Sequence, residues 1–285
     1  MIRRFENEDK EQLIKILKQG IVIVGQDNID SIIGESDRII VYDENETGIC
    51  GFSSLMRWGI DGINGKIITY VAPRSRKKGI GTLLYNKIMK YADELKLNLI
   101  NTEFRVDKDD ATLFYKKLGY EKWFGLHEMH YNGSEQPKSD MKFVSYEDKY
   151  FEQYVEGLRN SFYEMRRVHD FQPHLCCEFS KEKREELLCS KDNIFLLLVN
   201  GNFAASASVK IDDKDSLGPI FVVPSYQGKK YGRIIAQFAI NEAIHRGINN
   251  INLEVVEWNI RAVNLYISLG FDIIQTTHTY RQVRI

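Results

Sequence analysis

One pattern of residues occurs twice in this chain, and the repeat limits the fold more than any other feature. Residues 71–81, read as VAPRSRKKGIG, return as VVPSYQGKKYG at 222–232, and residues 111–120, ATLFYKKLGY, return as AVNLYISLGF at 262–271. The prolines, the closing glycines and the tyrosines are each 151 residues apart. Because the offset is constant, no insertion separates the two landmarks. The repeat predicts two similar domains, each with a strand, helix, strand, helix unit.

A short polar segment separates the two copies. Residues 132–140, NGSEQPKSD, contain glycine and proline and lack hydrophobic periodicity, as is typical of a linker. We therefore expect an N-terminal domain at 1–131, a linker at 132–141 and a C-terminal domain at 142–285. A length of 285 residues agrees with two domains of ordinary size.

Charge and cysteine content exclude several classes of protein. The chain carries 39 Lys and Arg against 40 Asp and Glu, so its net charge of -1 provides no overall field for nucleic acid or an anionic membrane. The four cysteines are irregularly spaced, unlike a disulfide framework. The first residues turn acidic where a signal peptide needs its apolar core, and no apolar run reaches a membrane-spanning length. We expect a cytoplasmic protein with reduced thiols.

Strand and helix signals alternate in the same order in both halves. Amphipathic helical patterns follow the first strand of each half, at 9–17 and 150–163, and a second helix follows each proline-containing loop. Short helices end at Gly119 and Gly270, where glycine can take the left-handed conformation. This pattern predicts an α/β or α+β fold with a mixed sheet. Strands are expected at 2–5, 38–42, 51–57, 66–71, 97–106, 142–144, 194–199, 203–210, 220–223 and 251–256, with aromatic strands closing both halves.

The loop after each proline has the composition of an anion-binding turn. Its glycines allow close backbone approach, and the following helix presents unpaired N–H groups and the positive end of its dipole. Basic residues at 76–78 and 229–230 add charge. Neither copy is a P-loop or a dinucleotide fingerprint. For either copy taken alone, an ordinary solvated loop explains the residues equally well.

Taken together, the motifs resemble the GCN5-related N-acetyltransferases (GNAT). The family's phosphate-binding motif follows a Val-x-Pro strand end, and residues 71–81 match it throughout. Its second motif, Asn-x-x-Ala followed by Tyr and Gly-Phe, is matched by residues 259–271. The chain is therefore similar to a tandem GNAT protein. The resemblance implies two GNAT-like domains, each with a mixed, largely antiparallel sheet flanked by helices, and acetyl-CoA as co-substrate without a metal.

The resemblance also assigns residues to the cofactor. Pyrophosphate would lie on the N–H groups of residues 76–82 or 227–233, and pantetheine would lie beside the strand ending at Val71 or Val222, where a backbone N–H freed at a bulge can face the thioester oxygen. The residues assigned in this way are Val71, Arg76, Lys77, Lys78, Gly79, Ile80, Gly81 and Thr82 in the first half, and Val222, Gln227, Gly228, Lys229, Lys230, Tyr231, Gly232, Arg233 and Asn259 in the second.

Each half departs from the family pattern once. Lys108 stands where the second motif of the first half would have Asn, and Lys230 replaces a loop glycine in the second half. A side chain at Lys230 is expected to strain the loop or to hinder pyrophosphate. We expect the tighter cofactor site in the first half, with the second half as a catalytic or a degenerate partner.

The family's mechanism is direct attack of an amine on the thioester. Tyr115 and Tyr266 occupy the position of the general acid that protonates the leaving thiolate, although each ring could instead pack against the sheet. Glu103 and Glu254 stand at matching positions and are candidates for the general base. A salt-bridged strand glutamate is the competing reading of both.

The acceptor is the least defined part of the prediction. We expect a primary amine on a small molecule, with a peptide or protein amine as the first alternative, and a non-catalytic or half-degenerate acyl-CoA-binding regulatory protein as the rival class. The chain is expected to be a monomer or a homodimer. Residues 169–177, HDFQPHLCC, are assigned to the acceptor pocket or to a plain loop rather than to a metal site. The tryptophans are read as packing, and Asp107, Asp109 and Asp110 as a helix N-cap.

Overall fold

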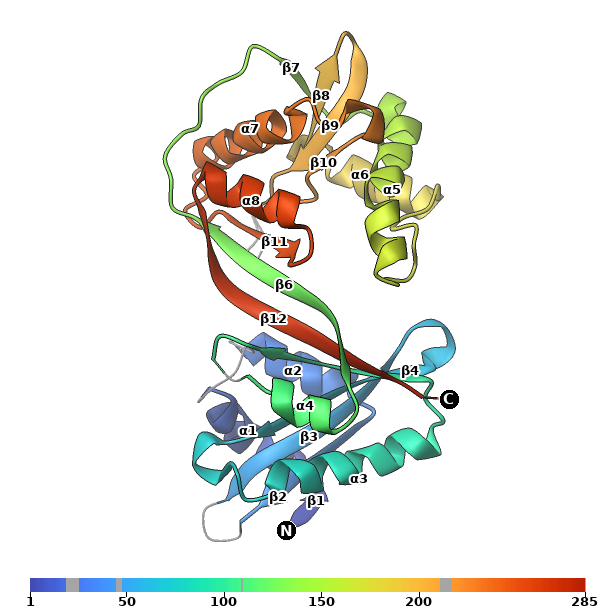
Figure 1. The fold of residues 1–285 in the computed structure, drawn as a ribbon, viewed down its shortest axis with the longest axis vertical. Helices are drawn as coiled ribbons and strands as arrows, with labels where there is room; N and C mark the ends of the chain where they lie inside the picture. Colours follow the sequence, from blue (N-terminus) through green and yellow to red (C-terminus); the bar gives the residue numbers. More distant parts are fainter. Residues whose placement is uncertain (19–25, 45–47, 109, 211–216, 285) are drawn as a thin grey trace. The chain divides into compact units, whose positions relative to one another are not determined.

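The computed structural model forms two compact units, which we describe separately (Figure 1). It describes residues 1–18, 26–44, 48–108, 110–210 and 217–284. Unit 1 comprises Met1–Gly125 and Thr276–Ile285, and unit 2 comprises Leu126–Gln275. The predicted ranges 1–131 and 142–285 follow the sequence repeat. The compact units instead divide after Gly125 and return the end of the chain to unit 1.

Unit 1 is built on a mixed sheet in which neighbouring strands are mainly antiparallel. The order is β1-β2-β3-β4-β5 followed by the end of β12, and among the described residues of this unit only β4 and β5 run parallel. That parallel pairing covers residues 64–66 against 99–101 and then stops. The strands are β1 (Ile2–Arg4), β2 (Arg38–Asp43), β3 (Ile49–Trp58), β4 (Asn64–Val71) and β5 (Leu99–Arg105).

Helices of unit 1 bury apolar stripes against this sheet. Leu84, Ile88 and Ala92 of α3 are buried with Ile67 of β4, whereas α1 belongs to a second cluster that contains Phe52. The helical spacing of these residues forms each stripe. The helices are α1 (Lys10–Leu17), α2 (Gln26–Glu35), α3 (Ile80–Glu94) and α4 (Thr112–Lys117), with single 3₁₀ turns at Asn7–Asp9, Ile60–Gly62 and Pro73–Ser75.

Unit 2 has the same order of strands and helices as the motif of unit 1, but its strands form two separate groups. Strands β10-β9-β8-β7 are antiparallel, and β11 pairs with residues 126–130 of β6. The strands are β6 (Glu121–Tyr131), β7 (Lys142–Ser145), β8 (Ile194–Val199), β9 (Asn202–Ser208), β10 (Phe221–Val222), β11 (Asn252–Val256) and β12 (Phe271–Val283). The helices are α5 (Phe151–Val168), α6 (Lys181–Cys189), α7 (Tyr231–His245) and α8 (Ile260–Leu269), with 3₁₀ turns at Asp148–Tyr150, Lys191–Asn193 and Pro224–Tyr226.

The last strand of each half pairs with the other half of the sequence. Residues 277–283 of β12 pair with 99–105 of β5 in unit 1, and residues 126–130 of β6 pair with 252–256 of β11 in unit 2. In Figure 1 these are the long light-green strand β6 and the long red strand β12. The closing strands were predicted, but alternation of side chains along a strand does not specify its partner.

The predicted α/β class, with sheets flanked by helices, is confirmed. Gly119 and Gly270 have φ values of +82° and +104°, as expected for glycines at helix ends. Helices α2 and α6 were not predicted. Among the described residues, no helix is both long enough and apolar enough to cross a membrane.

Candidate active sites

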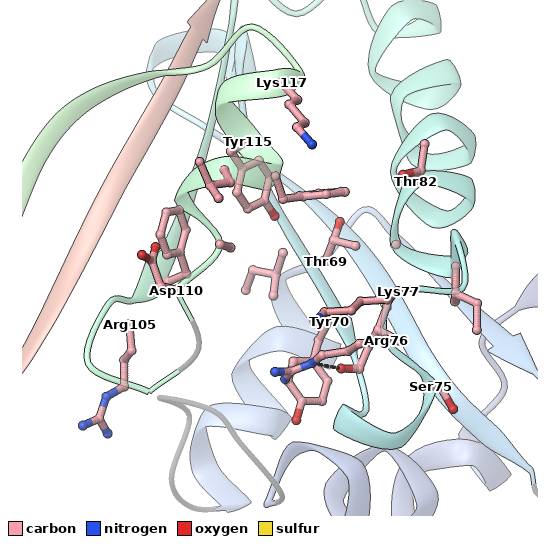
Figure 2. Close-up of a pocket in the computed structure, with 18 of the residues that line it drawn as sticks. Thr69, Tyr70, Ser75, Arg76, Lys77, Thr82, Arg105, Asp110, Tyr115 and Lys117 are labelled. Atoms are coloured by element: carbon pink, nitrogen blue, oxygen red, sulfur yellow. Dashed lines mark hydrogen bonds between the residues drawn. The ribbon is translucent and has the colours of Figure 1, made fainter.

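In unit 1 a pocket opens where β4 and β5 stop pairing. Its volume is about 840 Å³, and it is lined by the ends of both strands, the loop after Pro73, the start of α3 and the helix α4. Figure 2 shows how these elements surround the cavity. The two matching parts of the repeat, the loop after Pro73 and the helix α4, thus line the same pocket.

The open edge of β4 presents backbone groups to this pocket. Ala72 N–H donates to Cys50 O of β3 at 2.7 Å, so strand alternation turns the N–H and C=O groups of Thr69 and Val71 the other way. Val71 O accepts a hydrogen bond from Arg76 Nε at 2.9 Å. The Arg76 side chain therefore links the loop to the end of β4.

The loop after Pro73 leaves a series of backbone amides open. Lys77 and Gly79 have φ values of +61° and +80°, which turn the chain into α3. Within the described loop and helix, Leu83 is the first residue after Arg76 whose N–H donates to a backbone acceptor, to Gly79 O at 3.0 Å. The amides of residues 77–82 thus lie at the positive end of the helix dipole, an arrangement suited to phosphate. Lys77, Lys108 and Lys117 add positive charge along the lining.

Tyr115 lies on α4 with its ring buried and its hydroxyl directed toward Thr69 (Figure 2). The side chain is 2% exposed and stacks on Phe104 with 5.5 Å between ring centroids. Burial raises the pKa of the Tyr115 hydroxyl, while the nearby Thr102 and Thr69 hydroxyls act in the opposite direction. The phenol therefore keeps its proton at neutral pH. The structure supports both packing and pocket lining for this ring.

Glu103 also lines the pocket of unit 1. Its side chain is 41% exposed and forms an ion pair with Lys66 Nζ. The Glu103 carboxylate therefore lies in the pocket, as predicted for a general base, and is also salt-bridged, as the competing interpretation predicted. Of the residues assigned to the cofactor in this half, Lys78 alone is outside the lining, which contains Val71, Arg76, Lys77, Gly79, Ile80, Gly81 and Thr82.

Unit 2 has a corresponding pocket of about 730 Å³. Of the predicted residues, Lys229 and Glu254 lie outside its lining. Glu254 pairs across β11 and β6 with Glu128 and is exposed. The lining contains Val222, Gln227, Gly228, Lys230, Tyr231, Gly232, Arg233, Asn259 and Tyr266.

The two loops have the same backbone shape with glycine and lysine exchanged. In unit 2 the positive φ values fall on Gly228 at +78° and Lys230 at +66°, whereas in unit 1 the lysine comes first. Lys230 is therefore strained, as expected from the sequence. A Cβ built on Gly79 or Gly228 would have no atom within 4 Å outside its own residue and chain neighbours, so the space beside these two glycines is open.

Three hydrogen bonds make the unit 2 site less open. Arg233 N–H donates to Lys230 O at 3.0 Å, which removes one amide from the predicted phosphate site. Val222 O accepts from both Ser161 Oγ at 2.9 Å and Gln227 Nε2 at 3.1 Å. A carbonyl oxygen has two lone pairs, so this strand edge has little capacity left for a ligand amide.

The family asparagine of unit 2 serves as a helix cap. Asn259 Oδ1 accepts from Ala262 N–H at 3.2 Å at the start of α8. In unit 1, Asp110 Oδ1 accepts from Thr112 N–H, the first amide of α4, at 2.8 Å, so a carboxylate near the helix start takes part of the asparagine's place where the repeat has Lys108. The N-cap prediction is wrong for Asp110, because Ala111 is the N-cap residue of α4 and Asp110 precedes it. Asp107 pairs with Arg105, and Asp109 lies outside the described residues.

Tyr266 lines the unit 2 pocket from α8. It is 8% exposed, and its ring meets Phe271 edge to face with 5.8 Å between centroids. Burial raises the pKa of its hydroxyl to about 12.

An aromatic pair that the sequence did not reveal borders the unit 2 pocket. The rings of His169 and Trp258 stack with 3.6 Å between centroids and an interplanar angle of 4°, and both line the cavity. Tryptophan spacing carries no signal for such a pair, because the partners come from different elements. Of residues 169–177, only His169 lines this pocket.

Cys176 and Cys177 are free thiols beyond the pocket lining. Their mutual hydrogen bond lowers the pKa of Cys176 to about 7. In the described ranges, His, Cys, Asp and Glu side chains form no cluster suited to a metal ion. The sequence patterns are weakest at 18–36 and 159–192, the ranges from which we expect the acceptor pocket to be built, and residues 19–25 of the first range lie outside the described residues.

Comparison with known proteins finds similarity in both halves. Residues 35–122 match the model of the acetyltransferase (GNAT) domain, and residues 155–271 match that of the acetyltransferase (GNAT) family. The chain is 39% identical over 79 residues, 27% of its length, to the [ribosomal protein bS18]-alanine N-acetyltransferase of Escherichia coli strain K12. It is 39% identical over 54 residues, 19% of its length, to the mouse thialysine N-epsilon-acetyltransferase. These matches span 53% and 32% of the two relatives, respectively.

Solved structures with the same fold extend over the whole chain. A GCN5-related N-acetyltransferase from Sphaerobacter thermophilus superimposes with a TM-score of 0.72 at 13% identity, covering 99% of this chain and 95% of that one. A tandem GNAT protein from the clavulanic acid biosynthesis pathway has a TM-score of 0.61 at 13% identity, covering 99% and 98%. At such identities the likeness concerns the fold.

Proposed function

Because this chain belongs to the GNAT acetyltransferase family, with two of the family's domains in tandem, we propose that it transfers an acetyl group from acetyl-CoA to a primary amine of a small molecule. The observation that carries the proposal is the pocket of unit 1, which combines open loop amides, an open strand edge and a buried phenol. The proposal needs no metal ion. We place the protein in the cytoplasm, as a monomer or a homodimer.

The loop and strand of unit 1 supply the proposed acetyl-CoA site. Amides of residues 77–82 and the Lys77 side chain are suited to its pyrophosphate. The edge of β4 at Val71 is suited to the pantetheine arm, which can bond to it as another strand would, while the Thr69 backbone beside it bonds the Tyr115 hydroxyl. A backbone N–H of this edge would face the thioester oxygen and stabilise the negative charge formed during acyl transfer.

The chemical step moves two protons. The amine nitrogen forms a bond to the acetyl carbon, the carbon–sulfur bond breaks, and the thiolate leaves with the electron pair. Tyr115 gives its proton to that thiolate, a role favoured by its burial against Phe104 within the pocket. Glu103, which lines the same pocket, is proposed to accept the proton that the amine loses.

Differences between the units favour unit 1 as the active half. Its loop leaves the Thr82 amide open, whereas the matching amide of Arg233 is bonded to Lys230 O. Among the described residues, its edge carbonyl, Val71 O, accepts from Arg76, whereas Val222 O in unit 2 accepts from both Ser161 and Gln227. Glu103 lines its pocket, whereas Glu254 lies outside the other.

These differences also favour a second function for unit 2. The filled Val222 carbonyl and the strained Lys230 suit a site that binds an acyl-CoA or its nucleotide part without turnover. In this form, unit 2 is a degenerate regulatory partner of unit 1.

The acceptor has one alternative class. The Escherichia coli relative is named for acetylating an alanine of a ribosomal protein, and the mouse relative for acetylating thialysine. A peptide or protein amine is therefore the alternative to a small-molecule amine. An acceptor panel should contain small amines, lysine analogues and a peptide with N-terminal alanine.

Acetyl transfer to this panel, measured with Tyr115→Phe and Tyr266→Phe variants, tests the proposal. Tyr115→Phe should lower kcat by about 100-fold, the usual size of a general acid's contribution, and leave the Kd for acetyl-CoA unchanged. Tyr266→Phe is the matched control and should leave kcat unchanged. A loss confined to Tyr266→Phe would move the active site to unit 2. Binding of acetyl-CoA without turnover on any amine would identify a regulatory binding protein.

A further inference from the structure

The helix that carries Tyr115 is too short to hold its own position. Helix α4 has six residues, and isolated helices shorter than about 12 residues are marginal in water. The main chain of Tyr115 lies in its last turn, where Tyr115 O accepts hydrogen bonds from Leu118 N–H at 3.0 Å and Tyr120 N–H at 3.1 Å. Whatever holds Leu118 therefore also fixes Tyr115.

The C-terminal strand holds that last turn. Gln282 Nε2 donates to Leu118 O at 3.0 Å, satisfying a carbonyl that the end of a helix leaves open. The amide packs closely on the turn, because a Cβ built on Gly119 would lie 3.2 Å from Gln282 Nε2. Gln282 belongs to β12, in register with Ile100 of β5.

A second residue of the same strand supports the ring. Tyr280 is 3% exposed and lies 5.3 Å from Phe104 between ring centroids, and Phe104 stacks on Tyr115. Tyr280 is in register with Thr102, whose hydroxyl lies near that of Tyr115. Backbone and ring of Tyr115 are thus both supported by residues from the end of the chain.

Unit 2 contains the same hydrogen bond at the matching position. Leu269 follows Leu118 by the repeat offset of 151 residues, and its carbonyl accepts from Gln136 Nε2 at 3.1 Å. Gln136 comes from the segment after β6, the strand that is exchanged in unit 2. The chain therefore offers a matched glutamine for comparison.

We propose that Gln282 is a positioning residue for the Tyr115 phenol, acting through the last turn of α4 from a strand that the second half of the sequence supplies. Gln282 touches no reacting atom. Its catalytic consequence rests on the proposed function, whereas its effect on Tyr115 does not. The C-terminal strand then contributes to the chemistry of unit 1 as well as to its sheet.

The kinetic test compares Gln282→Leu, Gln282→Lys and the matched Gln136→Leu in the full chain. Gln282→Leu should lower kcat about tenfold, the effect expected from one ordinary hydrogen bond, and leave the Kd for acetyl-CoA unchanged. Gln282→Lys keeps a donor and should restore most of kcat. Gln136→Leu should leave kcat unchanged. Wild-type kcat in Gln282→Leu, a parallel loss of acetyl-CoA affinity, or an equal loss in Gln136→Leu would overturn the proposal.

A second readout needs no activity. In protein with carbon-13-labelled tyrosine rings, Tyr115→Phe and Tyr266→Phe assign the two NMR signals. Gln282→Leu should shift or broaden the Tyr115 signal and leave the Tyr266 signal in place. Gln136→Leu should do the reverse, and it should also move the signal of Tyr131, whose hydroxyl accepts from Gln136 Nε2 at 2.6 Å. An unmoved Tyr115 signal in Gln282→Leu would refute the positioning role even in an active enzyme. Absence of acetyl transfer by the wild type would instead refute the proposed function, and the NMR comparison would still decide the role of Gln282.

Discussion

At the scale of single residues, the two phosphate loops show how one backbone shape accepts different sequences. Each loop has two residues in the left-handed region, and each places one glycine and one lysine there, in opposite order. A lysine in this region costs about 1 to 2 kcal/mol relative to an ordinary conformation. The cost thus occurs once in each copy.

Replacing the strained lysine of unit 2 should stabilise it. Lys230→Gly removes the strain but adds freedom to the unfolded chain, so we expect a net gain of about 0.5 kcal/mol in the free energy of unfolding. Lys229→Gly is the control, because Lys229 lies outside the left-handed region and its replacement relieves no strain. It adds the unfavourable freedom and removes the exposed contacts of Lys229 Nζ with Ser225 O and the Tyr226 ring. Urea unfolding of the three proteins measures both effects. Equal destabilisation by the two variants would contradict the strain at Lys230.

Because Tyr266 is buried, the free energy of unfolding should fall as the pH rises above about 10. Burial raises its pKa to about 12 in the folded protein, whereas an unfolded tyrosine ionises near pH 10. The stabilising contribution is therefore complete below pH 10 and is lost as pH rises through 12. At pH 11 the wild type should have lost about 1 kcal/mol more stability, relative to pH 8, than Tyr266→Phe.

Urea unfolding at pH 8 and pH 11 measures this difference. Tyr163→Phe is the control variant, because Tyr163 is 39% exposed. If Tyr266→Phe and the wild type lose the same stability between the two pH values, the Tyr266 hydroxyl is not shielded from water as the structure indicates.

At the scale of elements, β12 covers the edge of β5 in the sheet of unit 1. Removing residues 276–285 exposes the edge of β5 and deletes Tyr280 from the core. In the shortened chain, amide hydrogens of β5 should exchange at least tenfold faster, since loss of a large buried aromatic ring costs about 3 kcal/mol or more. Amides of β11, whose partner β6 is retained, are the internal control. Unchanged protection of β5 would show that the exchanged strand does not stabilise unit 1.

The sequence predicted the elements better than their partners. The repeat located the strand-loop-helix motif and both tyrosine helices, because glycines, prolines and helical periodicity act locally. It could not reveal that β12 joins β5, since pairing depends on residues far apart in the chain. Among the site residues, Glu103 and Glu254 occupy matching positions in the repeat, yet only Glu103 lines a pocket. The hydrogen bond from Ser161 to Val222 O likewise joins distant segments.

At the scale of the whole molecule, duplication has produced two sites that need not do the same work. The shared offset of 151 residues preserves the loop, the tyrosine and the capping glutamine contact in both units. The two sites differ, by contrast, in the loop amide at Thr82 or Arg233 and in the strand-end carbonyl at Val71 or Val222, and both groups are less occupied in unit 1. One copy can thus retain the chemistry while the other is free to change.

The pairing of β6 with β11 and of β12 with β5 also determines the result of proteolytic cleavage in the segment 132–140. A cut there leaves piece 1–131 with the part of β6 that belongs to unit 2, and the second piece with the part of β12 that belongs to unit 1. The pairs β5–β12 and β6–β11 each take one strand from each piece. The nicked protein would therefore run as two bands on a denaturing gel yet migrate as one species under native conditions.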